Sequence, residues 1–142
     1  MRYIRQELFR EIGKKGQEIL GKSTVAIVGL GALGSVSAEL LARAGIGKLI
    51  LIDRDVVELS NLQRQALFDE DDIGKPKAAA AREKLNKINS GIKVDFFIDD
   101  LNFENISKII NAKNADLILD CTDNLETRFL INDFSIKNKI HF

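Results

Sequence analysis

Three glycines in the segment GLGALG carry the clearest chemical signal in the sequence. Gly29, Gly31 and Gly34 have the G-x-G-x-x-G spacing, directly after an apolar run at residues 24–28. Between a strand and a helix this spacing is typical of phosphate binding: the first glycine permits a tight turn, the second lets a ligand approach, and the third lets the helix pack closely. A helix beginning near Ala32 would point its free N–H groups at the anion. A tight turn without a ligand is the alternative, and the flanking elements favour nucleotide binding.

Two aspartates follow other apolar runs and should lie at the same edge of a sheet as the glycines. Asp53 ends the run 48–52, where dinucleotide-binding folds place an acidic residue that binds a ribose. Asp123 follows the run 115–120, where a carboxylate beside phosphates would hold Mg²⁺. Two alternatives stay open: Asp53 as a turn residue, and Asp123 as the N-cap of the last helix in a variant capping box with Glu126.

A long polar segment, SNLQRQALFDEDDIGKPK at residues 60–77, supplies candidate cations. Connections of this length are often functional. Arg64 lies among polar side chains, and Lys77 falls in the first turn of a helix, where the helix dipole disfavours a cation unless an anion lies beside it. This position therefore indicates a bound anion such as a triphosphate. The alternative is that both residues are exposed surface charges, and Lys75 is a rival for the role of Lys77.

The elements that would position these residues alternate along the chain. Apolar runs predict strands at residues 24–28, 48–52, 92–98 and 115–120. Helical periodicity predicts helices near residues 32–44, 76–89, 103–110 and 125–137, the last one burying Phe129, Leu130 and Phe134. This alternation predicts an α/β fold: a Rossmann-like parallel sheet with helices on both faces.

The two ends of the chain differ from this alternating pattern. Residues 1–22 predict a helical extension, which leaves 23–142 as the nucleotide-binding domain. The chain stops at residues 140–142, where a fifth strand should begin, so we expect an incomplete domain, part of a longer protein.

The composition limits the remaining kinds of chemistry. A length of 142 residues suits one domain, and the 21 basic and 21 acidic residues cancel, which argues against nucleic acid as a partner. Cys121 and His141 are too few for a structural zinc site, and Cys121 has no nearby histidine to activate it. The longest run of apolar residues and glycine, 25–34, is too short to cross a membrane. We expect a cytoplasmic protein without zinc and without membrane contact.

Five motifs occur in a characteristic order along nearly the whole chain: RYIRQ (2–6), GLGALG (29–34), DRDVVELSNLQRQ (53–65), GKPK (74–77) and DCTDN (120–124). Together they resemble the ThiF/MoeB/HesA adenylyltransferases, relatives of the ubiquitin-activating enzymes. In that family ATP binds in the Rossmann crevice and adenylates the C-terminal glycine of a ubiquitin-like sulfur carrier. The resemblance therefore implies an ATP-dependent adenylyltransferase that releases pyrophosphate.

The resemblance also implies a role for each site residue. Gly29, Gly31, Ala32 and Gly34 would form the nucleotide turn, with Ala32 replacing a glycine common in the family. Asp53 would bind the ribose, Asp123 would coordinate Mg²⁺, and the phosphates would be contacted by Asn61, Arg64 and Lys77. Arg5 matches an arginine that reaches the phosphates of the neighbouring subunit's site, so a homodimer is implied. Arg64, Lys77 and Arg5 would stabilise the charge that develops when a carboxylate attacks the α-phosphorus.

Three other functions remain open at this point. The chain could be an ATP-binding dimerisation module without catalysis, since family members usually continue well beyond this length. It could activate a threonylcarbamoyl group on tRNA or a small peptide instead of a sulfur carrier. An NAD-dependent oxidoreductase is the least favoured, because hydride transfer does not need a cluster of cations.

Overall fold

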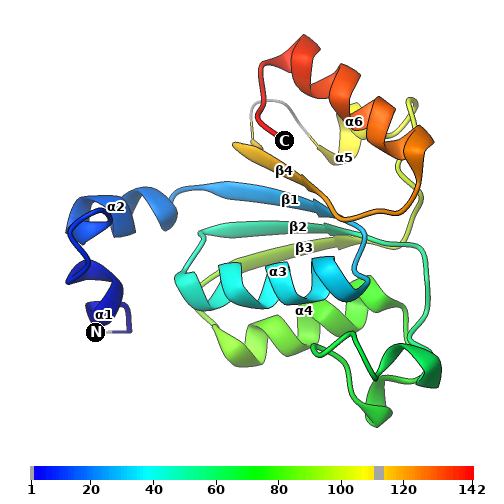
Figure 1. Ribbon diagram of the computed structural model, residues 1–142, viewed down its shortest axis with the longest axis horizontal. Helices are drawn as coiled ribbons and strands as arrows, with labels where there is room; N and C mark the ends of the chain where they lie inside the picture. Colours follow the sequence, from blue (N-terminus) through cyan, green and yellow to red (C-terminus); the bar gives the residue numbers. More distant parts are fainter. Residues whose placement is uncertain (1, 111–113) are drawn as a thin grey trace.

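A four-stranded parallel sheet lies at the centre of the molecule (Figure 1). The computed structural model describes residues 2–110 and 114–142. The strands are β1 (Thr24–Val28), β2 (Lys48–Ile52), β3 (Lys93–Phe97) and β4 (Leu117–Asp120), in the order β3-β2-β1-β4. This order is that of the first four strands of a Rossmann fold, 3-2-1-4. The predicted α/β fold is confirmed, and both central strands have the bounds that their apolar runs predict.

Helices cover both faces of the sheet because its strands are apolar on both sides (Figure 1). In β1, Val25 and Ile27 enter one core, whereas Ala26 and Val28 enter the other. The first core lies under α3 (Ala32–Ala44) and α4 (Lys77–Ile88), and the second under α5 (Ile106–Ile109) and α6 (Leu125–Asn138). Small residues on the inner faces of α3 and α4 allow both helices to lie close to the sheet: Gly34, Ser35, Ala38 and Ala42 in α3, and Ala78, Ala80 and Ala81 in α4.

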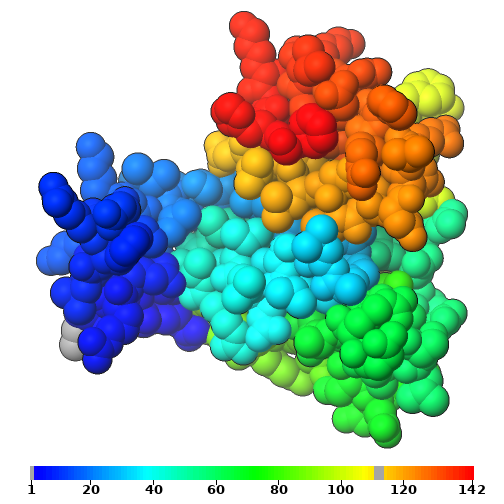
Figure 2. Space-filling model, in the orientation of Figure 1, coloured from blue at the N-terminus to red at the C-terminus, as the bar shows by residue number. Residues whose placement is uncertain are grey.

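The N-terminal extension is a separate projection beside the amino ends of the strands (Figures 1 and 2). It consists of α1 (Ile4–Glu7) and α2 (Gly13–Leu20). Gln6 and the buried Gln17 each donate from Nε2 to the carbonyl oxygen of Ala44 at 3.0 Å. These two hydrogen bonds fasten the extension to the C-terminus of α3.

The long connection between β2 and α4 is folded, with two 3₁₀ turns, η1 (Leu59–Asn61) and η2 (Glu70–Asp72). Its ends are paired through the backbone: Val57 N–H donates to the Lys75 carbonyl, and Gly74 N–H donates to the Val57 carbonyl, both at 2.8 Å. The connection therefore holds its residues in defined positions relative to the sheet.

Asp72 anchors this connection to α4 from a buried position. Its carboxylate accepts a hydrogen bond from the backbone of Asp69 at 3.1 Å and lies 3.0 Å from Lys84 Nζ and 3.3 Å from Lys75 Nζ. Burial raises the pKa of Asp72, but these hydrogen bonds outweigh burial, and the pKa lies below its ordinary value.

The prediction that α6 buries Phe129 is wrong. Ile131, Phe134 and Ser135 form the buried face, while Phe129 is 67% exposed. Successive residues turn by 100° around a helix, so Phe129 points away from the side that Ile131 and Phe134 share. Leu130 is only partly buried against the core.

The prediction of a helix from residue 103 is also wrong at its start. Phe103 is 78% exposed and α5 begins only at Ile106. Before it, the Asn102 side chain accepts from the backbone N–H of Glu104 at 2.9 Å, and the Asn105 side chain accepts from that of Asn102 at 2.8 Å. Such contacts stabilise turns in place of helix.

Beyond α6, the end of the chain lies beside the outer edge of β4. His141 forms a single parallel bridge with Leu117, and the backbone of Ile118 donates to the His141 carbonyl at 2.9 Å. This bridge is at the place where a fifth strand is expected.

Candidate functional site

A cavity of about 680 Å³ opens at the carboxyl ends of the strands. This volume lies within the usual range of small-molecule sites, roughly 300–1,000 Å³. Eight of the ten predicted site residues line it: Gly29, Gly31, Ala32, Asp53, Asn61, Arg64, Lys77 and Asp123. They come from the β1–α3 turn, the long connection and the loop after β4, so the topology brings together residues that are far apart in the sequence.

The glycine turn has no room for side chains at two of its three glycines. Gly29 has a φ of +89°, and a Cβ there would lie 2.8 Å from the Cys121 carbonyl oxygen. A Cβ on Gly34 would lie 1.9 Å from the Gly29 carbonyl oxygen, so Gly34 packs within the fold and does not line the cavity. A Cβ on Gly31 would come no closer than 3.9 Å to its nearest neighbour, Gln65. The open side of the turn is therefore at Gly31.

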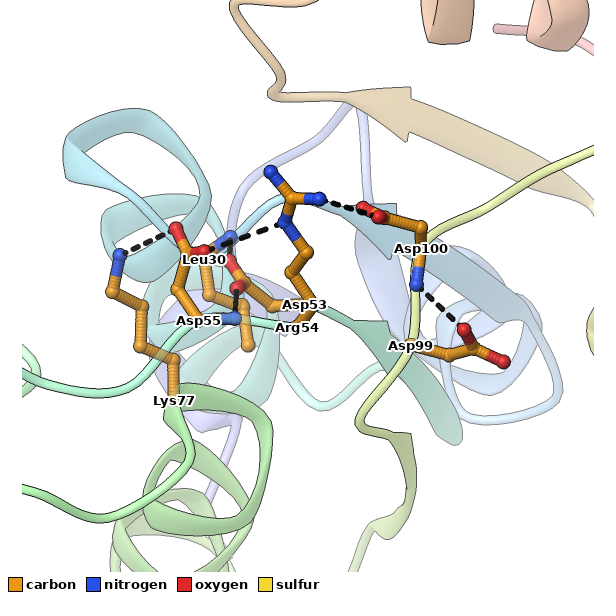
Figure 3. Close-up of polar contacts among 7 residues, drawn as sticks. All are labelled: Leu30, Asp53, Arg54, Asp55, Lys77, Asp99 and Asp100. Carbon is orange, nitrogen blue, oxygen red and sulfur yellow. Dashed lines mark hydrogen bonds and ion pairs between the residues drawn. The ribbon is translucent and has the colours of Figure 1, made fainter.

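Asp53 fastens the glycine turn to the end of β2 (Figure 3). One of its carboxylate oxygens accepts from the backbone N–H of Leu30 at 2.6 Å, and the other accepts from that of Asp55 at 2.8 Å. A carboxylate has about four acceptor positions, so Asp53 keeps acceptor capacity for hydroxyl groups. The contact with the turn is a positioning role that the sequence analysis does not predict.

Lys77 is buried, so its interpretation as an exposed surface charge is wrong. Only 6% of the residue is exposed, its backbone N–H donates to the Asp55 carbonyl at 2.8 Å, and its Nζ lies 3.3 Å from Asp55 Oδ2 (Figure 3). Its rival Lys75 pairs with Asp72 instead and does not line the cavity. The structure thus distinguishes two lysines that the sequence leaves as alternatives.

Asn61 is the last residue of η1, and Arg64 lies in the short turn that follows it. Asn61 is buried, and its Oδ1 accepts from the backbone of Glu58 at 3.1 Å. Arg64 is exposed, and its Nη1 donates to the Ser60 carbonyl at 3.0 Å. The guanidinium is thereby held at the cavity wall while most of its donors remain available.

The loop after β4 presents Asp123 to the cavity. Asn124 is the N-cap of α6: its side chain accepts from the backbone of Glu126 at 2.9 Å and of Thr127 at 3.3 Å. The alternative that Asp123 caps this helix is therefore wrong, because the neighbouring asparagine has that role.

The same loop is held by Asp120 at its start. Arg128 Nε donates to its carboxylate and the Thr122 hydroxyl does so too, both at 2.7 Å. Burial raises the pKa of Asp120, but these hydrogen bonds outweigh burial and leave the pKa below its ordinary value. Burial, together with the charge of Asp120, raises the pKa of the Cys121 thiol. A thiol with a raised pKa is a poor nucleophile at neutral pH.

Residues absent from the predicted site also line the cavity, among them Arg54, Asp55, Gln65, Asp99 and Asp100. Arg54 Nη1 donates to Asp100 at 2.6 Å and joins the end of β2 to the segment after β3 (Figure 3). For Asp99 and Asp100, the sequence signal that could have placed them in the site is their position directly after the strand predicted at residues 92–98.

The sequence pattern of the ThiF family matches residues 3–142. The chain belongs to the ThiF family. It is 50% identical to the sulfur carrier protein ThiS adenylyltransferase of Bacillus subtilis, over 99% of this chain and 42% of that protein, and 45% identical to the Escherichia coli protein of the same name, over 93% and 52%.

Solved structures of E. coli proteins share the same fold. TcdA, a tRNA N6-threonylcarbamoyladenosine dehydratase in complex with ATP, has a TM-score of 0.87 and 30% identity over 93% of this chain and 54% of that chain. MccB with AMPCPP and MccA has a TM-score of 0.87 and 30% identity over 99% and 43%. This ThiF-family chain thus spans about half the length of these relatives.

Arg5 does not line the cavity of its own chain. It is an exposed residue of α1, beside the amino ends of the strands, whereas the cavity is at their carboxyl ends (Figure 1). Within one ThiF-family chain, the tenth predicted site residue is therefore separated from the other nine.

The described part of the chain holds no group of three or more His, Cys, Asp or Glu side chains suited to a metal ion. A cation bound at Asp123 would thus depend on oxygen atoms of a ligand. Mg²⁺ is commonly bound this way, by one or two carboxylates together with substrate phosphates and water. None of the helices in the described ranges has the length and apolar character that a membrane crossing requires.

Proposed function

We propose that this chain is the ATP-binding part of an adenylyltransferase. The observation that carries the proposal is the convergence of the glycine turn, Asp53, Lys77 and Asp123 on one cavity. In the proposed reaction a carboxylate attacks the α-phosphorus of ATP, an acyl adenylate forms, and pyrophosphate leaves. This chemistry needs positioning and positive charge and no nucleophile from the enzyme.

We assign different parts of ATP to different residues of the cavity. The backbone at Gly29 and Gly31, together with the N-terminus of α3 at Ala32, suits the phosphates. In the same cavity, Asn61, Arg64 and Lys77 add hydrogen-bond donors and two positive charges for the phosphates. Asp53 accepts hydrogen bonds from the ribose hydroxyls. Gly34 supports the turn from behind.

We assign Mg²⁺ to Asp123. The carboxylate lies in the cavity wall and is not used as a helix cap, so it fits the donor set that Mg²⁺ prefers beside phosphates. When bound, the ion neutralises part of the triphosphate charge. The protein's own contribution is to hold this carboxylate in place through the Asp120 and Arg128 contacts.

As acceptor we propose the C-terminal glycine carboxylate of a ubiquitin-like sulfur carrier. The support is the 50% and 45% identity to sulfur carrier protein adenylyltransferases, against 30% to TcdA and MccB. The latter two make activation of a tRNA-borne threonylcarbamoyl group or of a small peptide the second candidate. The reaction would take place in the cytoplasm.

We further propose a homodimer in which Arg5 completes the partner's site. The exposed Arg5 and the distance of α1 from its own cavity support this arrangement. Ile4, Leu8 and Phe9 on the same extension are 44%, 70% and 58% exposed, and apolar side chains grouped in this way suit a protein interface. Residues 1–22 would thus form the dimerisation extension and residues 23–142 the nucleotide domain.

ATP–pyrophosphate exchange with candidate carriers tests the proposal. Exchange that requires a carrier ending in Gly-Gly would support it, and a carrier lacking those residues is the control. ATP binding without exchange in the presence of any carrier would indicate a dimerisation module, and preference for NAD over ATP would refute both.

A further inference from the structure

Gln65 is a buried polar side chain in the cavity wall with no function assigned so far. It is 3% exposed and lines the cavity. Its backbone is fixed at both ends: its N–H donates to the Asn61 carbonyl at 2.9 Å, and its carbonyl accepts from Phe68 N–H at 3.1 Å. The side chain thus projects from a rigid turn.

The carboxamide of Gln65 is incompletely hydrogen-bonded. Among the described residues, two buried side-chain oxygens have no partner, Gln65 Oε1 and Ser135 Oγ, and only Gln65 lines the cavity. A buried acceptor without a donor destabilises the folded state. Methionine has a similar length and would fill the same space without this penalty, so packing alone does not account for a carboxamide at this position.

The same carboxamide borders the open side of the glycine turn. Gln65 Nε2 would lie 3.9 Å from a Cβ on Gly31 and is the nearest atom to that position. The lack of a side chain at Gly31 therefore leaves a space between the turn backbone and the carboxamide. An amide N–H is a donor for an anionic oxygen, and hydrogen bonds to charged groups are the stronger kind.

Given the proposed function, we propose that Gln65 is a further nucleotide-binding residue whose carboxamide donates to a phosphate oxygen lodged beside Gly31. The contact uses the Nε2 donor, and the buried Oε1 takes no part in it. The turn 61–65 then contributes three side chains to the phosphates, those of Asn61, Arg64 and Gln65, and Gln65 is the one that borders Gly31.

The substitution Gln65→Met tests this inference, with Gln63→Met as the matched control. Gln63 lies two residues earlier in the same turn but is exposed and does not line the cavity. Calorimetry would measure the affinity of the 142-residue chain for Mg-ATP and for adenosine, and thermal unfolding without ligand would measure stability. For Gln65→Met we expect ATP affinity to fall about tenfold or more, because a hydrogen bond to a charged group is lost. Adenosine affinity and the unfolding temperature without ligand should not fall.

Three results would overturn the inference: unchanged ATP affinity, an equal loss for ATP and adenosine, or a lower unfolding temperature of the ligand-free Gln65→Met chain, which would indicate a structural role. If the variant does not fold, the side-chain NH₂ resonances of the unmodified protein decide. The Gln65 signal should shift with Mg-ATP and not with adenosine, while that of Gln63 stays in place, and an unmoved Gln65 signal would refute the contact. An unmodified chain that binds no ATP would contradict the proposed function itself, and the inference would fall with it.

Discussion

Lys75 and Lys77 are two residues apart and have different surroundings. Lys77 is buried in the cavity wall beside Asp55, whereas Lys75 is about half exposed and pairs with Asp72. Since charge-stabilising groups act only where charge develops, the two lysines make a matched pair for testing the site.

We expect Lys77→Ala to lower the rate of carrier-dependent pyrophosphate exchange by roughly 30- to 1,000-fold, equivalent to about 2–4 kcal/mol of transition-state stabilisation. Lys75→Ala should exchange at close to the unmodified rate. Rates measured at saturating carrier give the comparison. Equal rates for both variants would remove Lys77 from the catalytic machinery.

Acid should destabilise the protein through two carboxyl groups, Asp72 and Asp120. Both have a pKa below the ordinary value of 3.8 in the folded protein. A lowered pKa stabilises the fold fully above the unfolded-state value, and this contribution is lost as the pH falls through the folded-state value. Urea unfolding at pH 7, 5 and 3 should show a free energy of unfolding that drops mainly below about pH 4.

The variant Asp120→Asn isolates one of these groups. It should be less stable at pH 7 and lose less stability between pH 5 and pH 3 than the unmodified chain. Asp133→Asn, at an exposed position on α6, is the control. A pH dependence as steep in Asp120→Asn as in the unmodified chain would contradict the assigned contacts with Arg128 and Thr122.

For individual site residues, the sequence predicts the type of each residue and the edge of the sheet at which it lies, but not its contacts. Asp123 and Asp53 could be placed because each follows an apolar run that becomes a strand. The roles of Asp55 and Gln65 could not, because they depend on how the turn at residues 53–65 folds back over the cavity. The sequence also does not show whether Asp123 or Asn124 caps α6, because the answer changes if the helix begins one residue earlier or later.

Among the secondary-structure elements, the β1–α3 turn has the strictest steric requirement. Gly34 is in the first turn of α3, with the Gly29 carbonyl oxygen 1.9 Å from where a Cβ would be. Gly21, which follows α2, has a φ of −67°, and its nearest contact would be an ordinary 3.5 Å. The same substitution should therefore have opposite effects at the two positions.

We expect Gly34→Ala to destabilise the protein by about 1–3 kcal/mol through overpacking and to weaken ATP binding, because the turn must shift. Gly21→Ala should stabilise by about 0.4–1 kcal/mol, since it restricts only the unfolded chain. Urea unfolding of both variants checks the signs. A neutral Gly34→Ala would show that α3 can move away from β1 without loss.

Strands and helices are predictable where a continuous apolar run or one helical periodicity dominates. The runs TVAIV and KLILI match β1 and β2, and the small-residue segment 32–44 matches α3. The prediction is wrong near Phe103, where asparagine side chains compete for the backbone, and at Phe129, which is an exposed aromatic residue. Apolar content alone does not distinguish the two faces of a helix.

Arg5 concerns how two chains assemble, because helix α1 and the cavity of the same chain are at opposite ends of the strands. In the proposed two-fold dimer, each extension would reach the other chain's cavity. The sequence could suggest a role of Arg5 in the partner's cavity only through the family resemblance. No local sequence pattern shows whether a surface arginine acts in its own chain or in a partner chain.

Mixing two inactive variants tests this arrangement. Arg5→Ala and Lys77→Ala should each be nearly inactive, but a mixed dimer has one site in which both residues are intact. An equimolar mixture after subunit exchange should recover about a quarter of the unmodified exchange activity, because half of the dimers are mixed and each has one complete site. Absence of recovery in demonstrated mixed dimers, or full activity of Arg5→Ala alone, would show that Arg5 does not act across the interface.

The contact between Lys77 and Asp55 also has a consequence for which anions the cavity should prefer. Asp55 is a resident counter-ion for the ammonium group, 3.3 Å away before any ligand arrives. An incoming anion shares the ammonium group with this carboxylate and is repelled by it, so we expect the net gain to be small for chloride or acetate. A multiply charged phosphate chain contacts several partners at once and should gain more, so we expect the site to prefer polyanions over the simple salts of its surroundings.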